Sequence, residues 1–198
     1  MIWFKNFAIL WRVKFYLYFE RMKTYIALLR GINVGGKNKI LMAELRSLLV
    51  GMGLENVKTY IQSGNILFNA DDKTCVELET QINIAILSKF NLDVPVLVKT
   101  PENLQHIFDS CPFSEEEKQN SYFMMLYSKP ENNLVETVLE IEYQNERVNI
   151  SGSCIYFYAS QGYGRTKYNT NFFERKLKVT ATARNYKTML KLLELSHA

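Results

Sequence analysis

The stretch TYIALLRGINVGGKNK at residues 24–39 sets the architecture of the chain. Its first part, residues 24–29, is an apolar run of strand-forming residues and predicts a buried strand. Residues 41–52 place Leu45, Leu48 and Leu49 at helical spacing, which predicts an amphipathic helix. The residues between them, 30–39, are therefore a glycine-rich, cationic connection from the end of a strand to the start of a helix.

This connection has the chemistry of an anion-binding loop. Glycines let the backbone approach a ligand closely, free amide N–H groups point outward, and a helix N-terminus favours negative charge. The spacing of Gly31, Gly36 and Lys37 matches a P-loop, but Asn38 stands where a P-loop needs a Ser or Thr hydroxyl for Mg²⁺. No apolar strand ending in Asp is found to organise such a metal. Three interpretations follow: a nucleotide hydrolase, a different anion site, and a structural turn whose glycines supply positive φ.

The pattern around the loop is regular from residue 23 to residue 99. Residues 62–65, Gln-Ser-Gly-Asn, predict a hairpin turn, and Thr74 with Glu77 forms a capping box that predicts a second helix. The resulting order β-α-β-β-α-β is that of the ferredoxin-like split βαβ arrangement. Its sheet is antiparallel, which disfavours the P-loop interpretation. The predicted strands of this domain are residues 24–29, 57–61, 66–68 and 94–98.

Residues 100–198 predict a second small α+β domain with C-terminal helices, so the predicted fold class is α+β. Its first helix has Pro101 at the start, and its hairpin turn is Ser-Gly-Ser at residues 151–153. The acidic residues 114–120 predict a linker or an exposed loop. The other predicted elements are strands at 122–127, 147–150 and 155–158, and helices opening at Pro130 and covering 171–176 and 184–195.

Residues 1–22 are predicted to be an extension outside the fold. The run is aromatic and aliphatic, but Lys5, Arg12 and Lys14 interrupt it, so it is neither a transmembrane helix nor a good signal peptide. Met22 would make a normal N-terminus that leads straight into the first strand. The predicted domains are therefore residues 23–99 and 100–198.

The composition is that of a globular protein of a reducing compartment. Apolar residues make up 47% of the 198 residues and charged residues 22%, which suffices for a sizeable core. The three cysteines form no C-x-x-C pair, which disfavours disulfides and zinc and favours the cytoplasm. The two histidines supply neither a metal site nor a Ser/His/Asp or Cys/His arrangement. We predict no metal, no cofactor and no membrane partner.

The charge is unevenly distributed along the chain. Residues 161–191 carry a net charge of +7 and residues 1–22 carry +3, although the whole chain has only +4. A basic C-terminal segment against an acidic remainder suggests an anionic partner for that segment. The alternative is a solvated basic face.

Within the basic segment, residues 161–167 and 180–185 combine cations with a backbone that is predicted to be irregular. Arg165 and Arg184 are suited to bidentate contacts with phosphate or carboxylate. Arg184 could equally pair with an acidic residue of the other domain, and Thr182 or Asn185 could simply cap the last helix.

Aromatic residues alternate with these cations, which is one way to bind single-stranded nucleic acid by stacking. No ribonucleoprotein motif is present, however, and the alternative is that most of these rings belong to the core. The rings concerned are Tyr156, Tyr158, Tyr163, Tyr168, Phe172, Phe173 and Tyr186.

Four motifs in order along the chain resemble the bacterial domain-of-unknown-function family 1697. They are LLRGINVGGKN at residues 28–38, YIQSGN at 60–65, GRTK at 164–167 and ATARN at 181–185. The resemblance covers residue 22 to about residue 195, and the family often has Trp where this chain has Tyr186. It implies two α+β domains, the first ferredoxin-like, and an uncharacterised family with no established activity.

These observations lead to the hypothesis of a cytoplasmic protein that binds a phosphorylated or other anionic ligand between the glycine-rich loop and the C-terminal cations. The alternatives are a non-catalytic nucleic-acid-binding protein and an interaction protein without a small-molecule site. An enzyme would have to use Lys or Tyr as acid or base. The predicted ligand-binding residues are Arg30, Asn33, Gly35, Gly36, Lys37, Asn38, Gln62, Ser63, Asn65, Arg165, Lys167, Arg184 and Asn185.

Overall fold

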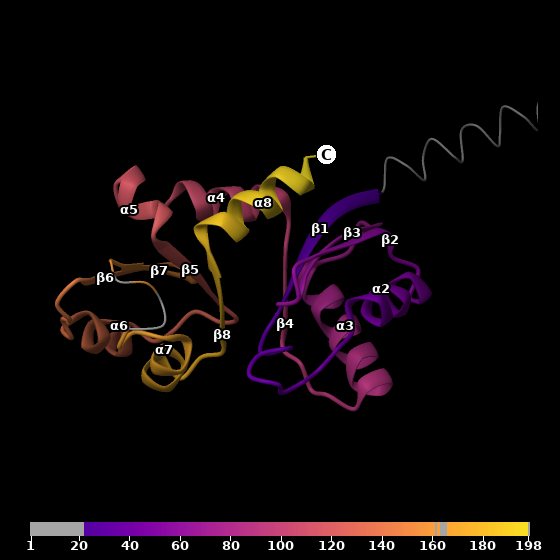
Figure 1. The fold of residues 1–198 in the computed structure, drawn as a ribbon, viewed down its shortest axis with the longest axis horizontal. Helices are drawn as coiled ribbons and strands as arrows, with labels where there is room; N and C mark the ends of the chain where they lie inside the picture. The colour runs from indigo at the N-terminus through magenta and orange to yellow at the C-terminus, as the bar shows by residue number, and fades with distance from the viewer. Residues whose placement is uncertain (1–21, 161, 163–165, 198) are drawn as a thin grey trace, which may run out of the picture.

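The computed structural model describes residues 22–160, 162 and 166–197 of the chain (Figure 1). Over these residues the chain forms seven helices and two four-stranded antiparallel sheets, which confirms the predicted α+β class. Apart from Met22, the first residue of β1, the predicted extension at residues 1–22 lies outside the described residues. Among the described helices, none is long and apolar enough to cross a membrane.

The two sheets share one strand order. The first contains β1 (Met22–Leu29), β2 (Glu55–Tyr60), β3 (Asn65–Asp71) and β4 (Val96–Lys99) in the order β2-β3-β1-β4. The second contains β5 (Ser121–Leu126), β6 (Glu146–Ser151), β7 (Cys154–Ala159) and β8 (Ala181–Asn185) in the order β6-β7-β5-β8. The helices are α2 (Met42–Gly51), α3 (Cys75–Phe90), α4 (Pro101–Asp109), α5 (Glu115–Gln119), α6 (Asn132–Leu139), α7 (Thr170–Leu177) and α8 (Tyr186–Ser196).

We call β1 to β4, with α2 and α3, the N-terminal unit, and β5 to β8, with α6 and α7, the C-terminal unit. Each unit has the element order β-α-β-β-α-β. In the N-terminal unit Thr74 caps α3 in the predicted capping box, and its side chain accepts from the Glu77 amide. Thr100 caps α4, which has Pro101 at its first turn as predicted. Local sequence therefore fixes where these helices begin.

Three apolar clusters lie between successive layers of the molecule. One joins the first sheet to α2 and α3, and another joins the second sheet to α6 and α7. The cluster between the two sheets contains residues of both sheets together with α4 and α8, such as Leu28, Leu104, Phe123 and Met189. Figure 1 shows α4 and α8 side by side above the second sheet, with α6 and α7 below it. The two units are thus joined by a shared hydrophobic layer.

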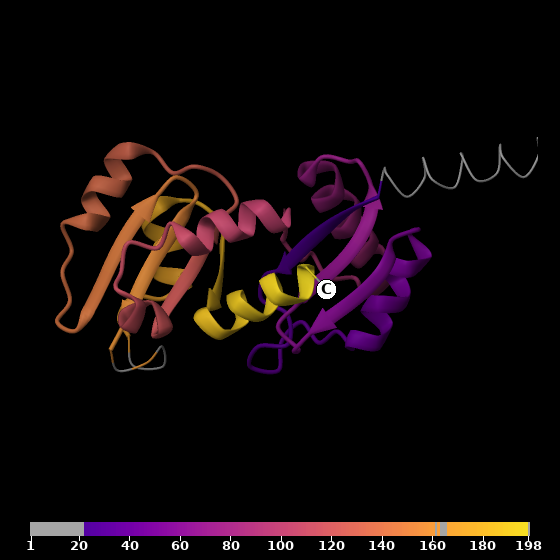
Figure 2. The ribbon, with the colours of Figure 1, turned by 90° about the horizontal axis from the view of Figure 1, so that it is seen from above.

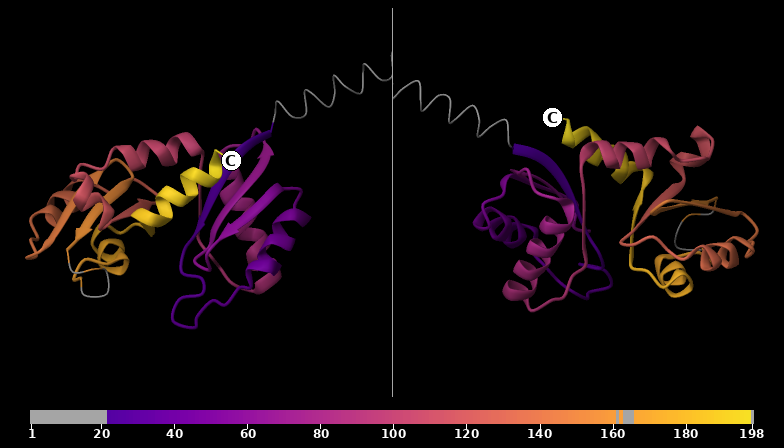
Figure 3. Two further views of the ribbon diagram at one scale, coloured as in Figure 1. Left: turned by 45° about the horizontal axis from the view of Figure 1, so that its top comes forward. Right: turned by 180° about the vertical axis from the view of Figure 1, so that it is seen from behind.

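Helix α8 extends from the C-terminal unit to the N-terminal unit. It begins directly after β8 in the C-terminal unit, and its last residues reach β1 of the N-terminal unit (Figure 2). Views from the other sides show α2 and α3 on the face of the first sheet that is turned away from the C-terminal unit (Figure 3). Both faces of the first sheet are therefore covered.

Four predictions for the second half were wrong. Residues 180–185, predicted to be irregular, contain the strand β8, which pairs with β5 at the edge of the second sheet. The last helix therefore begins at Tyr186 rather than at Arg184. Residues 114–120, predicted to be a loop, contain the short helix α5, whose cap Ser114 and third residue Glu117 form a capping box. The helix expected from Pro130 begins two residues later, at Asn132.

Candidate functional site

A cleft of about 710 Å³ lies between the two units, bounded by the glycine-rich loop on one side and by β8 with the start of α8 on the other. In Figure 1 the loop between β1 and α2 faces the side of β8 and α7. Among the described residues, the lining contains cations but no Asp, Glu, His or Cys. Its residues are Leu29, Arg30, Gly31, Ile32, Val34, Lys37, Asn38, Ile61, Ser63, Tyr122, Thr170, Asn171, Ala181, Thr182, Ala183, Arg184, Asn185 and Thr188.

The glycine-rich loop is a small hairpin rather than a phosphate cradle. Lys37 donates its amide to the Val34 carbonyl at 3.0 Å, and the two residues between them, Gly35 and Gly36, have φ of 57° and 78°. Two positive φ values at the centre of a two-residue turn are typical of a type I′ turn, which favours glycine. Neither glycine is among the cleft-lining residues. Their position therefore agrees with the interpretation of the loop as a structural turn whose glycines supply positive φ.

Two asparagines hold this hairpin in place. Asn33 exchanges hydrogen bonds with the main chain of Ile40 and also donates to the Gln62 carbonyl at 3.0 Å. Asn38 donates to the Gly31 carbonyl at 3.1 Å. Both asparagines have positive φ, a conformation that Asn adopts more readily than most residues. The Asn33 contacts tie the loop to the turn between β2 and β3.

Arg184 is buried at the floor of the cleft and connects the two units. The residue is 7% exposed, and its guanidinium donates to Asn65 Oδ1 and to the carbonyls of Leu29 (3.0 Å), Ser63 (3.3 Å) and Gly64 (3.4 Å) in the N-terminal unit. Within its own unit it donates to Thr182 Oγ1 at 2.7 Å and to the Ala183 carbonyl at 2.9 Å. The acceptors of Arg184 are all neutral, so it does not form the ion pair with an acidic residue of the other unit. Its donors are used within the protein, so they are not free for a bidentate contact with a ligand.

The charge of Arg184 has no carboxylate partner among the described residues. Burial alone lowers the pKa of its guanidinium to about 10, because removal from water disfavours the charged form. The neighbouring Tyr127 is partly buried, and this burial raises the pKa of its hydroxyl. A buried cation held only by dipoles leaves a positive field in the cleft that faces it.

Arg30 carries the ion pair between the units that was considered for Arg184. Its guanidinium makes a bidentate contact with Glu174 of α7, with Nε 2.6 Å from Oε1. Glu174 Oε1 also accepts from the amide of Ala181 at 2.8 Å. The charge of Arg30 is therefore neutralised within the protein.

The helix N-termini that face the cleft belong to the C-terminal unit. Asn185 caps α8 by accepting from the Thr188 amide, and both residues line the cleft. Thr170 and Asn171 at the start of α7 line it too. Helix α2 was expected to contribute its dipole, but none of its residues lines the cleft. Sequence reasoning included Asn185 but missed Thr170, Asn171 and Thr188, because it assigned the dipole to the helix that follows the glycine-rich loop.

The structure divides the thirteen predicted site residues. Arg30, Lys37, Asn38, Ser63, Arg184 and Asn185 line the cleft. Asn33, Gly35, Gly36, Gln62 and Asn65 support the loop and the turn behind it. Lys167 is not brought together with them: its ammonium lies over the ring of Tyr143, away from the cleft. Arg165 lies outside the described residues.

The aromatic residues of the basic segment belong mainly to the core. Tyr156, Tyr168, Phe172 and Phe173 are all buried. Tyr186 packs on Phe108 with ring centroids 5.4 Å apart, and Tyr158 lies beside Arg147. Tyr163 lies outside the described residues. The described rings therefore form no open stacking surface.

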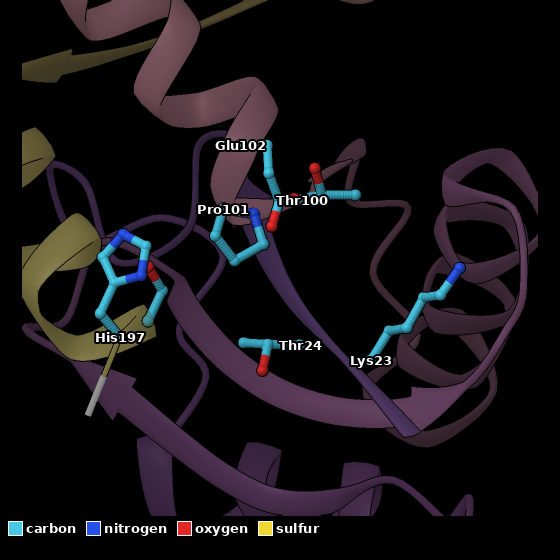
Figure 4. A pocket seen from close by; sticks show the side chains of 7 residues that line it. Lys23, Thr24, Thr100, Pro101, Glu102 and His197 are labelled. Atoms are coloured by element: carbon cyan, nitrogen blue, oxygen red, sulfur yellow. The ribbon is translucent and has the colours of Figure 1, made fainter. Parts of the chain in front are cut away.

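A second hollow of about 480 Å³ lies where α4 begins and α8 ends, beside β1 (Figure 4). Its charged groups are dispersed: Lys23 pairs with Asp72, and in Figure 4 it lies apart from Glu102 and His197. None of the predicted site residues lines it. Across the described residues, no group of three or more His, Cys, Asp or Glu side chains is placed to hold a metal ion.

Comparison with known proteins identifies the family. The protein family of unknown function DUF1697 matches residues 22–156. The chain belongs to this family. The resemblance inferred from the four motifs is thereby confirmed, although the matched region ends before Arg184.

A solved structure agrees with the fold of this DUF1697 protein. The conserved bacterial protein SP0830 from Streptococcus pneumoniae is 27% identical in sequence, with a TM-score of 0.69. The alignment covers 88% of this chain and 99% of that chain. Among curated proteins, none matches the sequence.

Proposed function

We propose that this DUF1697 protein binds a small anionic ligand, a phosphate ester or a carboxylate, in the cleft between the glycine-rich loop and β8. The observation that carries the proposal is Arg184. It is a buried cation at the floor of the cleft whose partners are all neutral. Burying a charge without a counter-charge is expensive, and an anion in the cleft offsets that expense.

Lys37 is the cation that would contact the ligand directly. It is exposed, it lines the cleft, and no carboxylate pairs with it among the described residues. Arg184 acts through its field instead, because its N–H donors are already engaged. The N-terminus of α8 adds a partial positive charge at the same cleft, where anions are favoured. A cleft of about 710 Å³ falls within the usual size range of small-molecule sites.

The proposal concerns binding. Any acid–base step in the cleft would rest on Lys37 or Tyr122, because the lining has no His, Cys, Asp or Glu in the part of the chain that the structure describes. The nucleic-acid alternative loses the stacking surface that was considered for it, since most of the described aromatic residues of the basic segment pack inside the protein, and it then rests on the net charge of residues 161–191. We also propose that each unit is a separate domain of the ferredoxin-like arrangement, on the basis of its element order and strand order. Three unpaired cysteines support a reducing, cytoplasmic location.

The test is anion binding by the full chain and by two matched variants. Thermal unfolding is followed with inorganic phosphate, pyrophosphate, sugar phosphates and nucleotides at low and high salt. A ligand at about 100 times its Kd adds about 2.7 kcal/mol, which raises Tm by roughly 5–10 °C for a chain of this size. Lys37→Ala is expected to weaken binding by about tenfold or more.

Lys39→Ala is the control, because Lys39 is exposed on the same loop and does not line the cleft. Both variants remove one positive charge from one loop, so a general electrostatic effect would weaken binding equally in the two. No shift with any anion, or equal losses in the two variants, would contradict the proposed site.

A further inference from the structure

Ile61 combines two unfavourable features at the edge of the cleft. It lies in the turn between β2 and β3 with φ of 48°, in the left-handed region. For a β-branched residue this conformation is an outlier, because the branched side chain crowds the backbone. The residue is also 50% exposed, so an apolar side chain is held in water on a strained backbone. Asn or Gly would adopt the same turn at a lower energy.

The surroundings of Ile61 enforce this conformation. The next residue, Gln62, accepts from Asn33 of the glycine-rich loop, and Ser63 and Gly64 accept from Arg184. The network that fixes the buried cation therefore also fixes the turn that presents Ile61. Strain maintained in this way is a common property of binding sites.

A second exposed apolar side chain lines the same cleft. Val34 is 64% exposed at the corner of the glycine-rich hairpin, next to the turn of Gly35 and Gly36. Val34 and Ile61 come from two segments that Asn33 joins. The cleft thus contains cations and also exposed apolar groups, all within its lining.

We propose that the ligand is amphipathic: an anionic group placed near Lys37 and Arg184, and an apolar body, at least as large as a phenyl ring, that covers Val34 and Ile61. This inference rests on the proposed anion site and names the class of its ligand. The apolar body removes the exposed side chains of Val34 and Ile61 from water, which is a favourable contribution that a purely polar phosphate cannot make. The strained turn is then explained as the means of presenting Ile61.

The experiment compares four probes by isothermal titration calorimetry: inorganic phosphate, ribose 5-phosphate, phenyl phosphate and 1-naphthyl phosphate. The full chain is expected to bind the two aryl phosphates at least tenfold more tightly than ribose 5-phosphate. Ile61→Asn relieves the strain and is expected to leave Tm unchanged or raised. It is expected to reduce aryl phosphate affinity about tenfold, the effect of leaving one to two methylene groups in water, without changing the affinity for inorganic phosphate.

Ile84→Asn is the matched control, because Ile84 is 59% exposed on α3, against 50% for Ile61, and does not line the cleft. It is expected to leave all four affinities unchanged, whereas Val34→Ser should lower those of the aryl phosphates. Equal binding of aryl phosphates and ribose 5-phosphate would overturn this inference and leave the anion site standing. Aryl phosphate affinities that are unchanged by Ile61→Asn and Val34→Ser would also overturn this inference and leave the anion site standing. Absence of binding by every probe would overturn the anion site as well.

Discussion

Replacing Arg184 with Leu is expected to loosen the junction between the two units. In the native protein the guanidinium supplies donors to both units at once, including Asn65 Oδ1 and the carbonyls of Leu29 and Ser63. Leu fills much of the same volume but donates nothing. The acceptors on the N-terminal side then remain away from water without a partner.

The expected loss of stability follows from these acceptors. Arg184 donates to four acceptors of the N-terminal unit, and the Gly64 carbonyl keeps a second donor, the Leu29 amide. The other three, Asn65 Oδ1 and the carbonyls of Leu29 and Ser63, lose this donor, and each orphaned acceptor costs about 1 kcal/mol or more. Leu carries no charge, so the variant avoids the cost of desolvating the buried guanidinium, and this gain reduces the net loss of stability. We expect a decrease of about 3 kcal/mol in the free energy of unfolding, or roughly 6–12 °C in Tm.

Urea unfolding followed by circular dichroism measures this difference directly. Arg175→Leu is the control, since Arg175 is exposed on α7 and the same substitution there should change the free energy of unfolding by no more than about 0.5 kcal/mol. A loss below about 1 kcal/mol for Arg184→Leu would show that the junction does not depend on the guanidinium. An equal loss of stability in Arg175→Leu would also show that the junction does not depend on the guanidinium of Arg184.

Three further predictions concern a turn glycine, an ion pair and a buried tyrosine. Gly64→Ala should cost about 2–5 kcal/mol in urea unfolding, because φ is +76° and a Cβ would meet Leu29 Cβ at 2.5 Å; Gly53→Ala, with φ of +85° and open space, should cost only about 1 kcal/mol. Glu174→Gln should lower stability by about 1 kcal/mol and tighten phosphate binding in calorimetry, because it releases the charge of Arg30. Burial raises the pKa of Tyr168 to about 12, so the unfolded chain loses this proton first, and urea unfolding should show stability falling between about pH 10 and about pH 12. Tyr168→Phe, which lacks this proton, should reduce that slope, and an unchanged slope would contradict the assignment.

The sequence predicted the N-terminal unit closely because its signals are local. A capping box at Thr74, a Pro at the start of α4 and a hairpin turn at residues 62–65 each act within a few residues. Ser114 and Glu117 also form a capping box, which predicts a helix start. The acidic composition of residues 114–120 led instead to the prediction of a loop. Acidic side chains in a first turn favour a helix, since they face the positive end of its dipole. That error was avoidable.

Strand β8 was harder to predict. Its sequence, Ala-Thr-Ala-Arg-Asn, includes Ala and Asn, which are depleted in strands, and it has no large apolar residue. It forms a strand because β5 offers an open edge for pairing and because α8 then continues into the shared hydrophobic layer. Pairing of this kind depends on segments about sixty residues apart. The partners of Arg184 were unpredictable for the same reason, since they arise only when the two units dock.

Three of the four motifs that identify the family meet at Arg184. The first provides the Leu29 carbonyl, the second provides Ser63, Gly64 and Asn65, and the last provides Arg184 itself. Docking of the two units therefore explains why these residues occur in three of the motifs, and this explanation requires no ligand. It gives no reason for Lys37, which belongs to the first motif, is exposed at the cleft and takes no part in the junction. Lys37→Ala with Lys39→Ala is therefore the comparison that separates a binding site from a structural junction.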